Sequence, residues 1–169
     1  MLFPITMSIV APLSGALSDK IGSELLTFIG LVIMVIAQVG LSTLHASSSI
    51  LFVGSLVAIL GLGNGLFQSP NNSLVMSSVP RSQLGIAGSI NSLIRNIGMV
   101  VNIAVATTTL FSVMSAKAGY RVTGLIPNQP DIFIDGMHIV LIGSASICFV
   151  AALLTGMRLF KAKVAVRQE

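Results

Sequence analysis

The chain has 169 residues, of which 54% are hydrophobic and 8% are charged. Soluble domains carry about 25% charged residues, so this composition excludes a soluble globular protein. The nine basic residues that give a formal net charge of +4 are spread along the chain without interleaved aromatic residues, which argues against nucleic acid as a partner. The composition predicts an all-α membrane protein, a polytopic bundle of transmembrane helices surrounded by the lipid bilayer.

Five apolar runs have about the length that a membrane span needs. Crossing about 30 Å of hydrocarbon takes about 20 helical residues. The predicted spans are 1–17, 25–44, 50–79, 86–114 and 136–160, followed by a cytoplasmic tail at 161–169, all within a single domain. The first run starts abruptly, contains Pro4 and Pro12 and lacks the basic start of a signal peptide. We expect it to be the end of a helix whose beginning is missing.

The distribution of basic residues predicts the topology. Successive connectors alternate between the two sides of the membrane. One side receives Lys20, Arg81, Arg158, Lys161, Lys163 and Arg167, and the other receives Lys117 and Arg121. Because basic connectors stay in the cytoplasm, we expect a multi-pass protein of the cell membrane with its C-terminus in the cytoplasm and the N-terminus of this chain outside.

The spans differ in polarity. The runs 25–44 and 136–160 are mostly apolar, so we expect them on the outside of the bundle, facing lipid. Small and polar residues recur at helical spacing in the other two long runs: Gly61, Asn64, Gln68 and Asn71 in 50–79, and Gly88, Asn91, Arg95, Gly98 and Asn102 in 86–114. An amide or guanidinium facing lipid tails would lack hydrogen-bond partners, so both stripes should point inward.

Two interpretations of these stripes stay open. In the first, the amides hydrogen-bond between helices and the glycines let backbones approach. In the second, the polar residues line a cavity for a small-molecule substrate. The candidates for that lining are Asn64, Gln68, Asn71, Asn91, Arg95 and Asn102.

Arg95 is the most informative single residue. It follows the start of its run by about ten residues, or on the order of 15 Å of helix, which places it near the middle of the hydrocarbon. An arginine there costs several kcal/mol unless it meets water or a partner. Alternatively, the helix starts earlier and Arg95 extends its side chain to the headgroups.

The glycines between 61 and 65 are expected to pack helices. The segment Gly-Leu-Gly-Asn-Gly does not fit the dinucleotide pattern GxGxxG, because residue 66 is leucine. Gly61 and Gly65 form a GxxxG pair, and Pro70 predicts a kink nearby.

The sequence offers no catalytic or metal-binding constellation. His45 and His138 lie at the ends of runs without a companion ligand, and the single cysteine, Cys148, lies inside the last run. We therefore predict that the chain is not an enzyme and uses no metal or cofactor.

Residues 15–22, Gly-Ala-Leu-Ser-Asp-Lys-Ile-Gly, resemble the cytoplasmic loop signature G-x-L-[AS]-D-[RK]-x-G of the major facilitator superfamily. The signature residues here are Gly15, Asp19, Lys20 and Gly22. Further along, the ordered set Gly61-x-Gly-x-Gly65, Pro70, Val79-Pro80, Gly85 to Gly88, Gly98 and Asp135 to His138 is similar to the late spans of the fourteen-span drug:proton antiporter branch. Ser23 and Glu24 depart from the family, which usually has further basic residues after the signature.

The resemblance implies that the chain is the last five spans of a C-terminal half. Such transporters consist of two bundles of inverted repeats that rock around a midplane site. The implied function is alternating-access export of drugs or amphipathic metabolites in exchange for protons, with the missing N-terminal helices of the same transporter as partner. Asp19 and Lys20 would bias the inward-closed and inward-open states. Proton coupling in this family relies on membrane carboxylates, and none lies within a predicted span.

Two alternatives to a working transporter remain. The chain could be a non-transporting membrane scaffold or accessory subunit, which would have no need of an arginine near the midplane. It could also be an inactive truncated transporter, because five spans cannot form two rocking bundles.

Overall fold

The computed structural model describes residues 2–45, 48–124 and 130–166, and in the last helix the side chains of 131–159. The elements are α1 (Leu2–Ile21), α2 (Ser23–Leu41), α3 (Ile50–Ser77), the short 3-10 helix η1 (Arg81–Gln83), α4 (Leu84–Ala118) and α5 (Pro130–Val166). No strand occurs in these ranges, and five of the helices are long and apolar enough to cross a membrane. This confirms the predicted all-α membrane fold.

The first two long helices are joined by a single residue, whereas the sequence predicts a connector from Ser18 to Glu24. α1 runs to Ile21 and α2 starts at Ser23, so Gly22 alone makes the turn. Its φ of 92° lies in the left-handed region, which glycine adopts without a steric penalty. Asp19 and Lys20 therefore lie in the last turn of α1 rather than in a loop.

The last helix is longer than its apolar run. α5 continues to Val166, so the predicted tail at 161–169 starts as helix. Residues 167–169, including Arg167, lie outside the described residues, as does Met1 at the other end of the chain.

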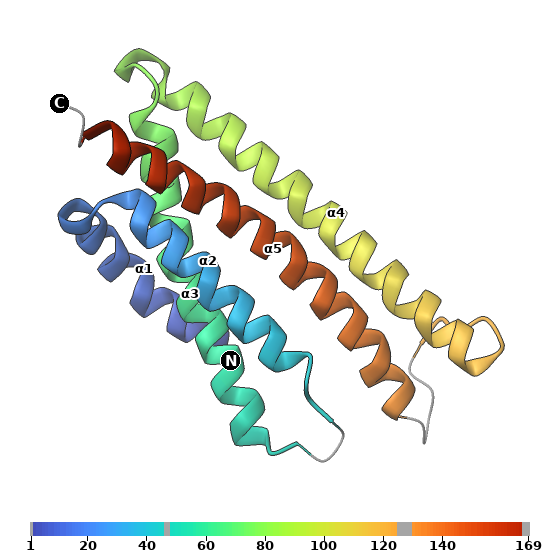
Figure 1. Cartoon of the computed structure of the whole chain (residues 1–169). Helices are drawn as coiled ribbons and strands as arrows, with labels where there is room; N and C mark the ends of the chain where they lie inside the picture. The colour runs from blue at the N-terminus through green and yellow to red at the C-terminus, as the bar shows by residue number, and fades with distance from the viewer. Residues whose placement is uncertain (1, 46–47, 125–129, 167–169) are drawn as a thin grey trace.

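α3 passes behind α2 in Figure 1 and packs against both α1 and α2, and α5 lies between α2 and α4. α2 packs between α3 and α5, and α4 packs mainly against α5. Consequently the fraction of buried residues in the most apolar window of each span is largest in α2, at 39%, and smallest in the span that contains α4, at 6%. We predicted an outer position for the run 25–44, and the difference has a physical reason: lipid tails and neighbouring helices are both apolar, so an apolar run suits either surroundings.

Glycines let α2 and α3 touch through their backbones. A Cβ atom added at Gly30 would lie 2.7 Å from the backbone nitrogen of Phe67 and 2.8 Å from the carbonyl oxygen of Gly63. One added at Gly63 would lie 3.0 Å from the carbonyl oxygen of Gly30. Real Cβ atoms do not approach this closely, so this crossing requires the small residues.

α1 packs on the opposite side of α3, at Gly61 and Gly65. An added Cβ would lie 2.8 Å from the carbonyl oxygen of Phe3 at Gly61, and 3.0 Å from Cβ of Val10 at Gly65. The fully buried Ser14 hydroxyl of α1 donates to the carbonyl oxygen of Gly65 at 2.9 Å. This bond fixes the register of the two helices.

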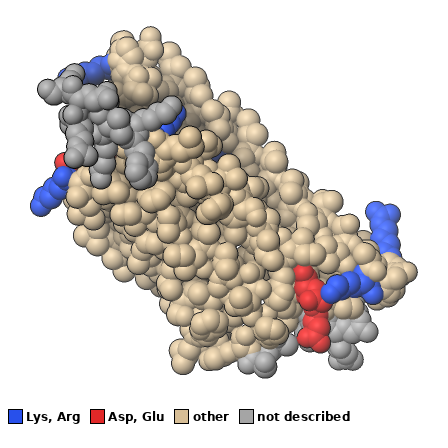
Figure 2. All heavy atoms as spheres, viewed as in Figure 1, with Lys and Arg blue, Asp and Glu red and all other residues tan. Residues whose placement is uncertain are grey.

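Charged residues gather at the two ends of the bundle (Figure 2). A broad band without visible charge separates them on this face, and the helices run along its length. The alternating chain direction puts the α1–α2 turn, the α3–α4 connector and the end of α5 at one end. The α2–α3 connector and the α4–α5 connector lie at the other end.

Candidate functional site

The two polar stripes meet near the η1 connector. The Asn91 Nδ2 on α4 donates a hydrogen bond of 2.9 Å to Asn72 Oδ1 on α3, and both residues are half-buried. A Cβ added at Gly88, one turn earlier, would be in ordinary contact with the Met76 methyl group at 3.6 Å. Asn72 was not among the predicted site residues, although it directly follows the candidate Asn71 in the sequence.

The rest of the α3 stripe is half-buried. Asn64, Gln68 and Asn71 have intermediate exposure, and Pro70 between them is buried. Proline lacks a backbone N–H, so α3 loses one helical hydrogen bond at this point.

The α4 stripe diverges from α3 beyond Asn91. Arg95 is exposed, and within the described residues it makes no hydrogen bond and no ion pair. An added Cβ at Gly98 would meet nothing within 4 Å. The structure therefore joins Asn91 to α3 but leaves Arg95 and Gly98 on an open face of α4.

Asn102 faces α5 instead of α3. It lines a pocket of about 230 Å³ between the two helices, together with Thr109 of α4 and Ser144 of α5. The six polar candidates are therefore not brought together: four lie along α3 up to Asn91, Arg95 lies on the open face of α4, and Asn102 lies at the α4–α5 pocket.

A polar cluster of Gln38, Ser144 and Cys148 lies between α2 and α5. The Ser144 hydroxyl is 3.2 Å from Gln38 Oε1, and Gln38 Nε2 is 3.7 Å from Cys148 Sγ. Gln38 is 8% exposed. The cluster was not predicted, because both runs are mostly apolar, although an amide inside an apolar run is itself a signal.

The signature residues at the α1–α2 turn are mostly exposed. Asp19 and Lys20 point away from the bundle core, whereas Gly15 faces α3. A Cβ added at Gly15 would lie 3.2 Å from the Ser69 hydroxyl oxygen. Gly15 and Gly22 thus have local packing and turn roles, and the two charged residues are free of helix packing.

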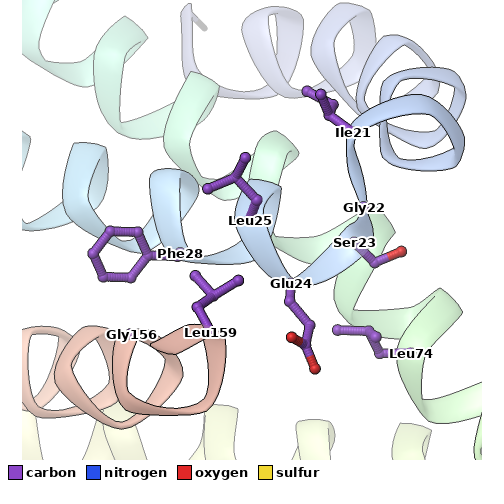
Figure 3. A pocket seen from close by; sticks show the side chains of 9 residues that line it. All are labelled: Ile21, Gly22, Ser23, Glu24, Leu25, Phe28, Leu74, Gly156 and Leu159. Atoms are coloured by element: carbon purple, nitrogen blue, oxygen red, sulfur yellow. The ribbon is translucent and has the colours of Figure 1, made fainter. Parts of the chain in front are cut away.

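A pocket of about 590 Å³ opens beside this turn, and we call it the Glu24 pocket. Its lining residues are Ile21, Gly22, Ser23, Glu24, Leu25, Phe28, Leu74, Gly156 and Leu159. Figure 3 shows the Glu24 carboxylate directed into the space between Leu74 and Leu159. Glu24 departs from the family pattern and was not among the predicted site residues.

Polar contacts at the opposite end connect α4, α5 and the segment that follows α2. Lys117 of α4 pairs with Asp135 of α5 at 2.5 Å. His138 Nε2 lies 2.7 Å from the carbonyl oxygen of Leu44, and the His138 and His45 rings pack edge to face with centroids 6.3 Å apart. The described side chains include no group of three His, Cys, Asp or Glu that could hold a metal ion.

Residues 1–102 match the family model of the Major Facilitator Superfamily, which covers α1, α2, α3 and the first half of α4. The chain belongs to this superfamily. The result confirms the resemblance inferred from residues 15–22 at the level of the superfamily.

Curated relatives extend the similarity over most of the chain. The riboflavin transporter RibZ of Clostridioides difficile (strain 630) is 31% identical over 157 residues, which are 90% of this chain and 32% of that protein. The multidrug transporter protein MdtP of Bacillus subtilis (strain 168) is 32% identical over 124 residues, 73% of this chain and 22% of the relative. The multidrug resistance protein Stp of Mycobacterium tuberculosis (strain H37Rv) is 29% identical over 127 residues, 75% and 23% of the two chains.

This member of the superfamily spans about a third of the length of RibZ. Two of these relatives, RibZ and MdtP, are named as transporters. No solved structure matches the chain.

Proposed function

We propose that the chain is the C-terminal part of a secondary active transporter that exports drugs or amphipathic metabolites in exchange for protons by alternating access. The observation that carries this proposal is the similarity to named transporters over 157 residues, 90% of the chain. Relatives named for riboflavin and for multidrug transport support a substrate that combines apolar and polar surface.

The substrate pathway is proposed to follow the two polar stripes. Asn64, Gln68 and Asn71 supply amides from α3, and Asn91, Arg95 and Asn102 supply polar groups from α4. The open face of α4 supports this assignment, because a guanidinium on a membrane helix costs several kcal/mol unless water or a partner meets it. A water-filled cavity between this face and the remaining transporter helices would remove that cost.

Within the superfamily, we assign the chain to the fourteen-span drug:proton antiporter branch. Five spans of fourteen are about a third, which agrees with the 32% of RibZ that the chain covers. The missing N-terminal helices would supply the second bundle and the carboxylate for proton coupling. Asp19 and Lys20, exposed at the α1–α2 turn, would form charge pairs that differ between the inward-open and inward-closed states.

The orientation follows from the charges at the two ends. The end with Lys20, Arg81 and Arg158 is proposed to face the cytoplasm, and the end with Lys117 and Arg121 to face outward. The protein would then be a multi-pass protein of the cell membrane.

The proposal is tested by dye efflux from cells that lack their own efflux pumps and express the native polypeptide. We expect efflux of a fluorescent amphipathic dye that stops when a protonophore collapses the proton gradient. Arg95→Gln should slow it at least tenfold, while Arg121→Gln on the α4–α5 connector should not. Unchanged dye retention in cells that display the protein at the membrane would favour the scaffold or the inactive truncated transporter.

A further inference from the structure

The Glu24 pocket is separate from the polar face of α4. It opens between the first turn of α2 and the end of α5, with Leu74 of α3 as its third wall (Figure 3). Its volume of about 590 Å³ lies in the range of small-molecule sites, about 300–1,000 Å³.

The walls of the Glu24 pocket are mainly apolar. Their large apolar side chains are Leu25, Phe28, Leu74 and Leu159, of which Leu74 and Leu159 lie on either side of the carboxylate in Figure 3. The Phe28 ring lies against Gly156, where an added Cβ would be 3.1 Å from the ring. Glycine at 156 thus makes room for an aromatic ring in the wall of the pocket. An aromatic face attracts cations and also packs against apolar groups.

The Glu24 carboxylate makes the pocket suitable for a cation. Glu24 is half-buried, and no described basic side chain lies within ion-pair distance of it. Its position in the first turn of α2 is favourable for an acid, because the helix dipole is positive there. The helix dipole explains why an acidic residue is favourable at this position. It does not explain the cavity beside the carboxylate. A ligand with a positive head and an apolar body would match both features.

We propose that the Glu24 pocket binds an amphipathic ammonium ion, with its charged head at the Glu24 carboxylate and its apolar part against Phe28, Leu74 and Leu159. Two sources offer this chemistry: a free amphipathic amine, or a membrane lipid with an amine headgroup. The site is formed by α2, α3 and α5 and does not depend on the proposed transport, so binding can be measured without it.

The test uses the native polypeptide in phosphatidylcholine nanodiscs, with empty nanodiscs subtracted. The cationic probe trimethylammonium-diphenylhexatriene is compared with neutral diphenylhexatriene. We expect Glu24→Gln to weaken binding of the cationic probe about tenfold and to leave the neutral probe unchanged. Glu24→Asp should retain the preference for the cation. Asp131→Asn, which removes one exposed charge at the opposite end, is the matched control.

A second variant keeps the proposal testable if Glu24→Gln folds poorly. Leu74→Trp fills the pocket and keeps the carboxylate, so it should weaken both probes. The lipid source is supported if purified wild type retains phosphatidylethanolamine over phosphatidylglycerol and Glu24→Gln does not. The free amine is supported if lipid retention is equal but the cationic probe loses affinity. Equal binding of the cationic probe to wild type and folded Glu24→Gln would overturn the proposal.

Discussion

Asn91 on α4 and Asn72 on α3 share a hydrogen bond of 2.9 Å that joins two helices which otherwise diverge. The bond lies next to the η1 connector, where the chain passes from α3 to α4. Beyond Asn91, α4 packs against α5, and the face of α4 that carries Arg95 is exposed. The Asn pair therefore sets the point from which the two stripes separate.

A double-mutant cycle should detect this bond. We expect Asn91→Ala and Asn72→Ala to couple by about 0.6–1 kcal/mol, the usual size for a side-chain hydrogen bond between membrane helices. The measurement is the free energy of unfolding in mixed detergent micelles. Asn64→Ala combined with Asn91→Ala serves as the unpaired control, and strict additivity for the Asn91–Asn72 pair would contradict the assigned bond.

The α2–α3 crossing should not tolerate a side chain at Gly30. A Cβ there would meet backbone atoms of α3 at 2.7–2.8 Å, so Gly30→Val has to push the helices apart. We expect a loss of several kcal/mol or failure to fold. Gly143→Ala on α5 is the control, because nothing lies within 4 Å of its added Cβ. Equal thermal stability of Gly30→Val and wild type in detergent would rule out this close packing.

The all-helical membrane fold could be predicted because long apolar runs have few other physical solutions. The position of α2 in the bundle could not be predicted, because its leucines and glycines suit contacts with lipid and with other helices equally well. The length of the α1–α2 connector depended on one torsion angle, at Gly22, which composition does not reveal. Gln38 and Glu24 were missed because polarity was judged by run, although each side chain lies at a packed contact or a pocket.

The buried Gln38 should make Ser144→Ala measurably destabilising. Ser144 is the hydroxyl partner of Gln38 Oε1 at 3.2 Å, and an acceptor left without a partner in the interior costs about 1–3 kcal/mol. Gln38→Leu removes the amide altogether and should cost less than Ser144→Ala. Thermal unfolding of both variants decides the order, and Ser146→Ala on the exposed face of α5 is the control. The opposite order would show that Gln38 Oε1 does not depend on the Ser144 hydroxyl as its partner.

The Lys117–Asp135 ion pair should contribute little to stability despite its short distance. Its side chains are 50% and 42% exposed, and water and salt screen exposed pairs strongly. Asp135→Asn should therefore leave the midpoint of thermal unfolding almost unchanged, and added salt should reduce any difference from wild type. A large drop in that midpoint that salt does not reduce would mean that the pair is buried in the native protein.

The most direct test of the proposed substrate pathway is thiol labelling of the native polypeptide with a water-soluble maleimide. Single cysteines replace Asn64, Gln68 and Arg95 in a Cys148→Ser background, with Leu154→Cys on the apolar exposed face of α5 as the control. We expect the reagent to reach position 95 and at least one of 64 and 68, but not position 154. Failure to label any of the three stripe positions in folded, membrane-inserted protein would contradict a water-filled pathway along α3 and α4.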